Sequence, residues 1–231
     1  MKILVIDDEK PTLSMFKLFL TAYGFDVETA RDGETGLERF HELKPDIVFT
    51  DIKMPGMDGL EVLKKIRETD TQVQVIIITG HGDMDKAIQA LDLDASDFIN
   101  KPVERQALDS ALNRAEKRHA MKGPAAFTLK ALDFGPVLGL RLSGKLTGLC
   151  RETFEQEMNT ALSEGTAGVA FILDPSFSIN RTGLAFFTTI LQDLKQRGIE
   201  LRIENLSYNY NKVFQMAGLD KLADLVREKT G

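Results

Sequence analysis

The sequence predicts an α/β protein of two domains, in which β-strands and α-helices alternate along the chain. Short runs of strand length recur through the first half, and each precedes a segment with helical spacing of its apolar residues. The 231 residues exceed the usual size of one domain and supply enough apolar side chains for two cores. Gly123-Pro124 is a strong stop signal for the helix before it. We therefore expect domains over residues 1–121 and 127–231, joined by a linker over 122–126.

The first half is expected to contain five strand–helix pairs. Strands are expected at residues 3–6, 26–30, 47–50, 75–78 and 98–100. Helices are expected from Pro11 to a stop at Gly24, and at 34–43, 60–68, 85–93 and 104–117. The bounds of the first helix follow because proline is favoured in the first helical turn and glycine after the last.

The second half alternates as well, but with a different start. Strands are expected at 137–142, 168–174 and 200–203, with a turn at 143–146. Helices are expected at 151–162 and 182–196, through 213–216, and near 222–226. Because nothing in this pattern has the look of a helix-turn-helix motif, we expect a second α/β domain.

Polar side chains follow the strands of the first half at the point where each strand ends. Asp7 and Asp8 follow the first strand, Asp51 the third, Thr79 the fourth and Lys101 the fifth. The carboxyl ends of the strands in an open α/β sheet form the edge where ligands bind. We therefore expect three acids, a hydroxyl and an ammonium at one site.

Phosphoryl transfer is the chemistry that this set favours. Three clustered carboxylates raise one another's pKa unless a hard cation lies among them, and an oxygen-only cluster suits Mg2+. A metal beside a carboxylate lets that carboxylate accept a phosphoryl group, because it neutralises the charge that builds up during transfer. The Thr79 hydroxyl can then donate to a phosphoryl oxygen, while the Lys101 ammonium pairs with the phosphate or, before transfer, with Asp51.

The order and spacing of these residues resemble the receiver domain of two-component response regulators over roughly the first half of the chain. The matching motifs are Asp7-Asp8, Asp51, Met54-Pro55-Gly56-Met57-Asp58-Gly59, Thr79-Gly80, Ala95-Ser96-Asp97-Phe98 and Lys101-Pro102. The resemblance implies a flavodoxin-like (βα)5 doubly wound fold. It also implies a sensor histidine kinase or a phosphotransfer protein as partner.

The resemblance also implies a role for each matching residue. Asp51 would be the phosphoacceptor, and Asp7 and Asp8 would hold Mg2+ together with Asp51 and the backbone carbonyl of Lys53. Thr79 and Lys101 would bind and report the phosphoryl group.

Two further positions bear on the receiver resemblance. Phe98 matches the switch aromatic of the family and stands where many receivers have tyrosine. A phenylalanine can rotate and pack there but cannot hydrogen-bond. Asp94 replaces the glycine that is usual before Ala-Ser-Asp. A left-handed backbone is expected there, which aspartate tolerates better than most residues do.

The second half resembles a STAS domain, the fold of anti-sigma-factor antagonists, over most of residues 126–231. The segments that carry this resemblance are 141–146, 171–174, 180–184, 195–198 and 213–219. It implies an α/β domain with a mixed sheet and a protein partner, such as an anti-sigma-type serine kinase in a partner-switching circuit.

One loop departs from the antagonists. They carry Asp-Ser-Ser/Thr-Gly, with the first serine phosphorylated, where this chain has Asn180-Arg181-Thr182-Gly183. Arg181 cannot accept phosphate, and its charge opposes the dipole of the helix that follows, so it is either solvated or faces an acidic partner. Thr182 is expected to be the N-cap of that helix rather than a phosphosite.

Charge separates the two halves and bears on the function class. Up to Lys122 the chain has 17 basic and 23 acidic residues, whereas the rest has 12 of each. The absence of a basic stretch disfavours the main rival, a DNA-binding regulator. An enzyme site in the second half is disfavoured because it lacks clustered acids, a nucleophile with its base and a Gly-rich phosphate loop. A nucleotide-binding or scaffold role for this half stays open, as does a homodimer.

Location is inferred from three features. The single cysteine, Cys150, excludes an internal disulfide framework. No stretch approaches the ~20 apolar residues of a membrane span, and the chain begins with a strand rather than a signal segment. We expect a cytoplasmic protein that contacts neither membrane nor nucleic acid and does no enzymology beyond its own phosphotransfer and dephosphorylation.

Overall fold

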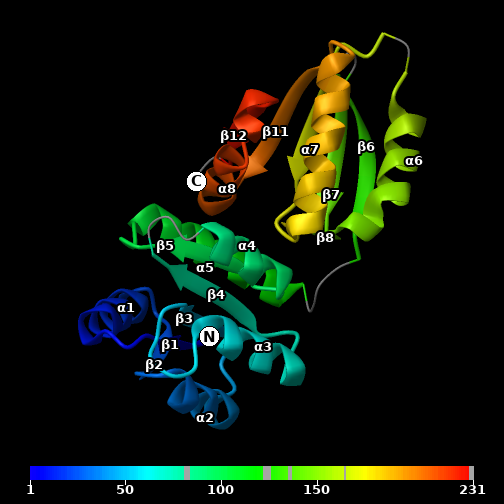
Figure 1. The fold of residues 1–231 in the computed structure, drawn as a ribbon. Helices are drawn as coiled ribbons and strands as arrows, with labels where there is room; N and C mark the ends of the chain where they lie inside the picture. Colours follow the sequence, from blue (N-terminus) through cyan, green and yellow to red (C-terminus); the bar gives the residue numbers. More distant parts are fainter. Residues whose placement is uncertain (81–83, 122–125, 135–136, 164, 229–231) are drawn as a thin grey trace. The chain divides into compact units, whose positions relative to one another are not determined.

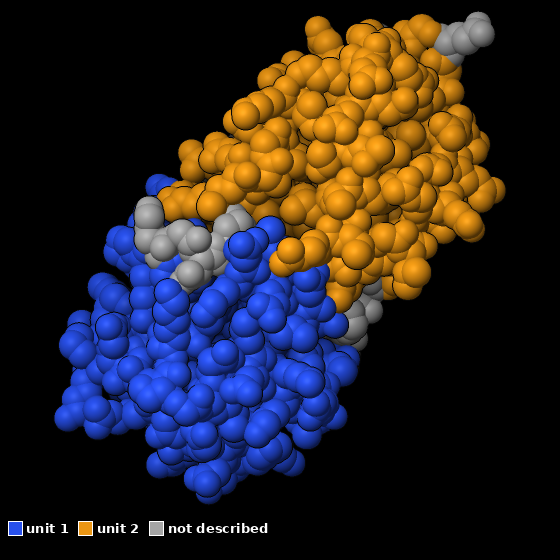
Figure 2. Space-filling model, viewed as in Figure 1, with its two compact units in different colours: residues 1–123 blue, residues 124–231 orange. Residues whose placement is uncertain are grey.

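The computed structural model describes residues 1–80, 84–121, 126–134, 137–163 and 165–228. The chain forms two compact units, Met1–Gly123 and Pro124–Gly231, which are coloured separately in Figure 2. Residues 122–125 of the expected linker lie outside the described residues. The exact domain bounds therefore stay a prediction.

The first unit is a parallel sheet with flanking helices (Figure 1). Its strands are β1 (Lys2–Ile6), β2 (Asp26–Ala30), β3 (Ile47–Asp51), β4 (Gln74–Thr79) and β5 (Asp97–Asn100), in the spatial order β2-β1-β3-β4-β5. Its helices are α1 (Lys10–Ala22), α2 (Gly33–Leu43), α3 (Gly59–Thr69), α4 (Met84–Asp92) and α5 (Arg105–Ala120). The expected five-stranded, doubly wound fold is confirmed.

Burial explains why the central strands read as continuous apolar runs. Every residue of β3 and β4 is buried, as are four of the five residues of β1. A parallel sheet covered by helices on both faces requires this pattern, whereas the strands of a sheet with one solvent-exposed face would alternate apolar and polar residues. The helices begin at polar caps. The Asp58 side chain accepts from the N–H groups of Leu60 and Glu61 at the start of α3, and Asp32 caps α2.

The backbone at Asp94 has the expected left-handed conformation. Its φ is 65°, which is costly for most residues other than glycine, asparagine and aspartate. The carbonyl of Asp94 accepts two hydrogen bonds from the Arg67 guanidinium, at 3.0 Å from Nε and 2.9 Å from Nη2. These contacts fix the turn that leads into β5.

The second unit contains a mixed sheet, as expected. Its strands are β6 (Thr128–Phe134), β7 (Val137–Ser143), β9 (Gly168–Leu173), β11 (Glu200–Leu206) and β12 (Asp224–Arg227), in the order β12-β11-β9-β7-β6. Only the pair β6–β7 is antiparallel among these strands of the described chain. The remaining elements are β8 (Lys145–Leu146), β10 (Ser178–Ile179), α6 (Arg151–Ala161), α7 (Arg181–Gln196), α8 (Tyr208–Met216) and the short 3-10 helices η1 (Gly148–Cys150) and η2 (Leu219–Lys221).

Aromatic side chains form the core of the second unit. The ring of Phe187 packs edge-on against Phe171, with centroids 5.1 Å apart, and Phe154 packs edge-on against Phe186 at 5.3 Å. Phe154, Phe171 and Phe187 are fully buried. Their packing joins α6 and α7 to β9 and therefore fixes the start of α7, where the STAS resemblance places its loop.

Two expectations for the second unit were wrong, and one strand was missed. The helix near 222–226 is instead the edge strand β12, which pairs in parallel with β11. Leu222, Leu225 and Val226 have helical spacing, but long-range pairing overrides this local pattern. The antiparallel strand β6 was missed, because only Leu129 is buried among its first four residues and the alternation is weak. The turn expected at 143–146 contains β8, which pairs with β10.

Candidate functional site

The candidate site lies at the carboxyl edge of the first sheet, beside β1 and β3, where the chain switches from adding strands on one side of β1 to adding them on the other. In the β1–β3 ladder Ile6 is opposite Thr50, so Asp7 and Asp51 follow side by side. In the next ladder Asp51 is opposite Ile78, which places Thr79 one residue further along the same edge. This crevice outside the strand ends is where open α/β sheets bind ligands.

Three carboxylates meet in this crevice. Asp7, Asp8 and Asp51 each offer one oxygen, and these oxygens all lie within 4.8 Å of one another. Asp7 and Asp51 are buried and Asp8 is half-buried. A set of hard oxygen donors open to water on one side fits a magnesium ion.

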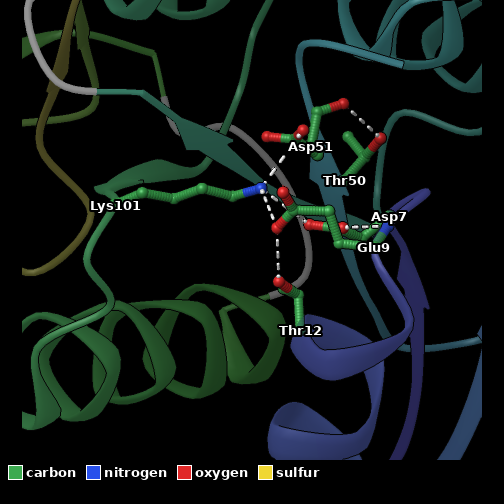
Figure 3. Close-up of polar contacts among 6 residues, drawn as sticks. All are labelled: Asp7, Glu9, Thr12, Thr50, Asp51 and Lys101. Atoms are coloured by element: carbon green, nitrogen blue, oxygen red, sulfur yellow. Dashed lines mark hydrogen bonds and ion pairs between the residues drawn. The ribbon is translucent and has the colours of Figure 1, made fainter. Parts of the chain in front are cut away.

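Lys101 follows β5 and extends across the edge to these acids (Figure 3). Its Nζ is 3.1 Å from Asp7 Oδ2 and 3.3 Å from Asp51 Oδ2. Both aspartates are therefore paired with the same ammonium. A lysine pairs as a point charge and can follow a charge that moves.

The electrostatics favour a further cation at this edge. The pKa of Asp51 is raised from 3.8 to about 6, mainly by burial; the charge of Lys101 opposes this rise, while the charges of Asp7 and Asp8 contribute to it. Burial also raises the pKa of Asp7, although the Glu9 backbone N–H and Lys101 act in the opposite direction. Burial lowers the pKa of Lys101, but its bond to Asp7 and the charge of Asp51 outweigh burial, so that this pKa is raised. The ionised aspartates are thus held at a cost that a divalent cation would remove.

Thr79 and Phe98 lie on neighbouring strands. Thr79 is fully buried, and within the described residues its Oγ1 has no hydrogen-bond partner. A buried hydroxyl without a partner costs free energy, so this group suits an incoming oxygen. Phe98 is opposite Ile77 in the β4–β5 ladder and is 1% exposed. Its movement on phosphorylation stays a prediction.

The loop after Asp51 is held against the strand by a glycine that sequence reasoning noted only as part of a turn. A Cβ on Gly59 would lie 2.1 Å from the Asp51 carbonyl oxygen, so only glycine fits. The Gly59 N–H also donates to the Ile52 carbonyl at 3.1 Å. Lys53, the expected donor of a backbone carbonyl, lies in this loop.

Sequence reasoning also missed Glu9 and Thr12. Glu9 Oε2 lies 3.7 Å from Lys101 Nζ, and Thr12 Oγ1 donates to the same oxygen at 2.9 Å (Figure 3). The signal that could have found this contact is an acid directly after Asp7-Asp8 with a hydroxyl three residues later.

The loop before α7 in the second unit differs from the expectation. Asn180, not Thr182, is the N-cap, because Asn180 Oδ1 accepts from the Gly183 N–H at 2.9 Å. Thr182 Oγ1 instead donates to Asn180 Oδ1 and accepts from the Gly148 N–H, each at 2.9 Å. The N-cap assignment of Thr182 was therefore wrong; asparagine is among the best caps, and it leaves the threonine to bridge to η1. Arg181 is exposed.

No helix within the described residues is both long enough and apolar enough to cross a membrane.

Comparisons with known proteins divide the chain in the same way. Residues 3–113 match the family model of the response regulator receiver domain, and residues 130–229 match that of the STAS domain. A solved structure of a response regulator receiver domain protein from Clostridium thermocellum is 42% identical. It aligns with a TM-score of 0.50, covering 52% of this chain and 97% of that one.

Curated relatives match mainly over the first unit. Chemotaxis protein CheY of Thermotoga maritima is 35% identical over 117 residues, which are 50% of this chain and 98% of that protein. Regulatory protein AtoC of Escherichia coli is 31% identical over 171 residues, which are 72% of this chain but 37% of AtoC. The chain spans about half of the length, or less, of most of the curated relatives that it matches.

Proposed function

Because this chain belongs to the response regulators, with a receiver domain followed by a STAS domain, we propose that Asp51 accepts a phosphoryl group and thereby controls a protein–protein interaction of the STAS domain. The donor is a sensor histidine kinase or a phosphotransfer protein. The observation that carries the proposal is the pairing of buried Asp51 with Lys101, 3.3 Å apart, beside the carboxylates of Asp7 and Asp8.

Each group at the carboxyl edge has a part in the transfer. A carboxylate oxygen of Asp51 attacks the phosphorus of a phosphohistidine, the N–P bond breaks, and the histidine nitrogen leaves with the electron pair. Asp7, Asp8 and Asp51 would hold Mg2+ with the Lys53 carbonyl, and a bound ion would supply positive charge that offsets the charge of the transferring group. The Lys101 ammonium and the Thr79 hydroxyl bind the new phosphoryl oxygens. The buried Thr79 hydroxyl gains the partner that it lacks within the described residues.

The STAS domain is the output. Its antagonist relatives are switched by a phosphoserine at the position that Arg181 occupies here, so this chain has moved the charge input to its receiver. Thr182 is a poor replacement for that serine as a phosphosite, since phosphate on its oxygen would remove the hydrogen bond that it donates to Asn180 and disturb the one that it accepts from the Gly148 N–H. The partner is a protein that docks at the start of α7, such as an anti-sigma-type serine kinase, and the protein acts in the cytoplasm.

A capture experiment tests the proposed function. The full chain is immobilised with Mg2+, with and without beryllofluoride as phosphoryl mimic, and candidate serine kinases encoded beside its gene are passed over it. The amount of retained kinase should differ between the two states, and Asp51→Asn should abolish the difference. Asp26→Asn, an equal charge change at an exposed site on β2, should behave as the wild type. Equal retention by the wild type in both states would contradict the proposal.

A further inference from the structure

Lys101 has a third acidic partner that none of the proposed roles uses. Glu9 Oε2 lies 3.7 Å from Lys101 Nζ, compared with 3.1 Å for Asp7 and 3.3 Å for Asp51. The aspartate side chains are 0% and 6% exposed, whereas the Glu9 side chain is 62% exposed. An ammonium has three N–H donors, so three carboxylates can share it. Glu9 is the one on the solvent side.

The start of α1 fixes the position of Glu9. The Glu9 backbone N–H donates to Asp7 Oδ1 at 2.9 Å, and Thr12 Oγ1 donates at 2.9 Å to the same Glu9 oxygen that faces Lys101. Glu9 is the N-cap residue of α1, yet its side chain makes no capping hydrogen bond. An N-cap side chain usually accepts from the first helical turn. This carboxylate is directed at Thr12 and Lys101 instead.

Glu9 and a phosphoryl group on Asp51 would compete for the same ammonium. In Figure 3 the carboxylates of Glu9 and Asp51 approach Lys101 Nζ from different sides. A phosphoryl group on Asp51 carries a charge of about −1.5 to −2 in place of the single negative charge of the carboxylate, and Lys101 has to turn toward it to form the pair. Glu9 attracts the ammonium toward α1, so neutralising Glu9 leaves Lys101 free to follow the phosphoryl group.

We propose that Glu9, tethered by Thr12, is a positioning residue that holds Lys101 in its unphosphorylated arrangement and weakens phosphoryl binding at Asp51. This role rests on the proposed function, since it requires a phosphoryl group at Asp51. It makes Glu9 and Thr12 determinants of how strongly the phosphorylated state is favoured. The contacts that carry it all lie within the first unit.

The dissociation constant of beryllofluoride tests this role without any chemical step. It is measured on the full chain with saturating Mg2+ from the fluorine NMR signal of the bound ion. Glu9→Gln should bind about two- to fivefold more tightly, the effect that a partly exposed ion pair exerts. Thr12→Val keeps the branched shape without the hydroxyl and should tighten binding less. The double variant should match Glu9→Gln, because Thr12 acts through Glu9.

Glu42→Gln is the matched control, since it makes the same charge change at an exposed residue of α2 and should bind as the wild type. Equal tightening by this control would make the effect one of net charge and overturn the positioning role. Unchanged or weaker binding by Glu9→Gln would also overturn it, while leaving the proposed function intact. If the wild type failed to bind, or Asp51→Asn bound equally well, the proposed function itself would fall, and the role of Glu9 with it.

Discussion

Replacing Asp51 by asparagine should stabilise the first unit when Mg2+ is absent. The buried carboxylate has its pKa raised from 3.8 to about 6, so its ionised form is held at a cost in the folded state. A shift of roughly two pKa units corresponds to about 3 kcal/mol of unfolding free energy above pH 6. Asparagine has nearly the shape of the protonated acid and avoids this cost. The favourable pairing with Lys101 is already included in the pKa of about 6, since Lys101 is one of the groups that lower it.

The pH dependence has a definite sign. Between about pH 4 and pH 6 the folded state binds more protons than the unfolded one, so the wild type loses stability as pH rises through this interval. Asp51→Asn lacks this titration. The advantage of the variant should therefore be small near pH 4 and complete above pH 6.

Urea unfolding of the full chain in EDTA at pH 4.5 and pH 8 measures the advantage of Asp51→Asn. Hydrogen exchange of β3 and β4 peptides at each urea concentration reports on the first unit alone. With an m value of about 2 kcal/mol/M, the midpoint at pH 8 should rise by about 1.5 M urea. Saturating Mg2+ should reduce the difference, because it binds the wild-type aspartates. An equal or lower midpoint for Asp51→Asn at pH 8 would refute the reasoning, as would an equal gain from Asp26→Asn.

Three further predictions concern the loop, the transmission and the second unit. Gly59→Ala should lower the unfolding free energy by about 1–3 kcal/mol in the same urea assay, because its Cβ would meet the Asp51 carbonyl at 2.1 Å; an unchanged midpoint would contradict this. Beryllofluoride should change hydrogen exchange over residues 85–113 through Thr79 and Phe98, and a change confined to the surroundings of Asp51 would rule out this route. Incubated with ATP and an anti-sigma-type serine kinase, Arg181→Ser should acquire phosphate and the wild type should not. Comparable phosphate on wild-type Thr182 would contradict this prediction and mean that the protein is phosphorylated at two sites, Asp51 and Thr182.

The receiver fold and the position of its site could be predicted from the sequence because parallel topology places every strand end at one edge. Apolar runs identify the strands, and the residue after each run must therefore lie at this edge. Asp7, Asp51 and Lys101 come together in this way, although they are far apart in the chain. The left-handed backbone at Asp94 was predictable for a local reason, since aspartate stands at a turn position where glycine is usual.

The pairing of edge strands and individual side-chain contacts between distant segments could not be predicted in this way. The edge strands β6 and β12 owe their pairing to β7 and β11, and edge strands carry weak apolar patterns of their own. The N-cap of α7 was misassigned because both Asn180 and Thr182 are good caps by type. The structure decides between them, because Asn180 Oδ1 accepts from the Gly183 N–H while the Thr182 hydroxyl accepts from the Gly148 N–H of η1.

The role of Asp51 as phosphoacceptor is tested most directly by mapping the phosphate. The full chain is incubated with Mg2+ and a small phosphodonor, and the acyl phosphate is reduced with borohydride and located by mass spectrometry. One phosphate per chain, labile in acid and base, should map to Asp51, require Mg2+ and be absent from Asp51→Asn. A phosphate of the same stoichiometry that persisted in Asp51→Asn would contradict the assignment.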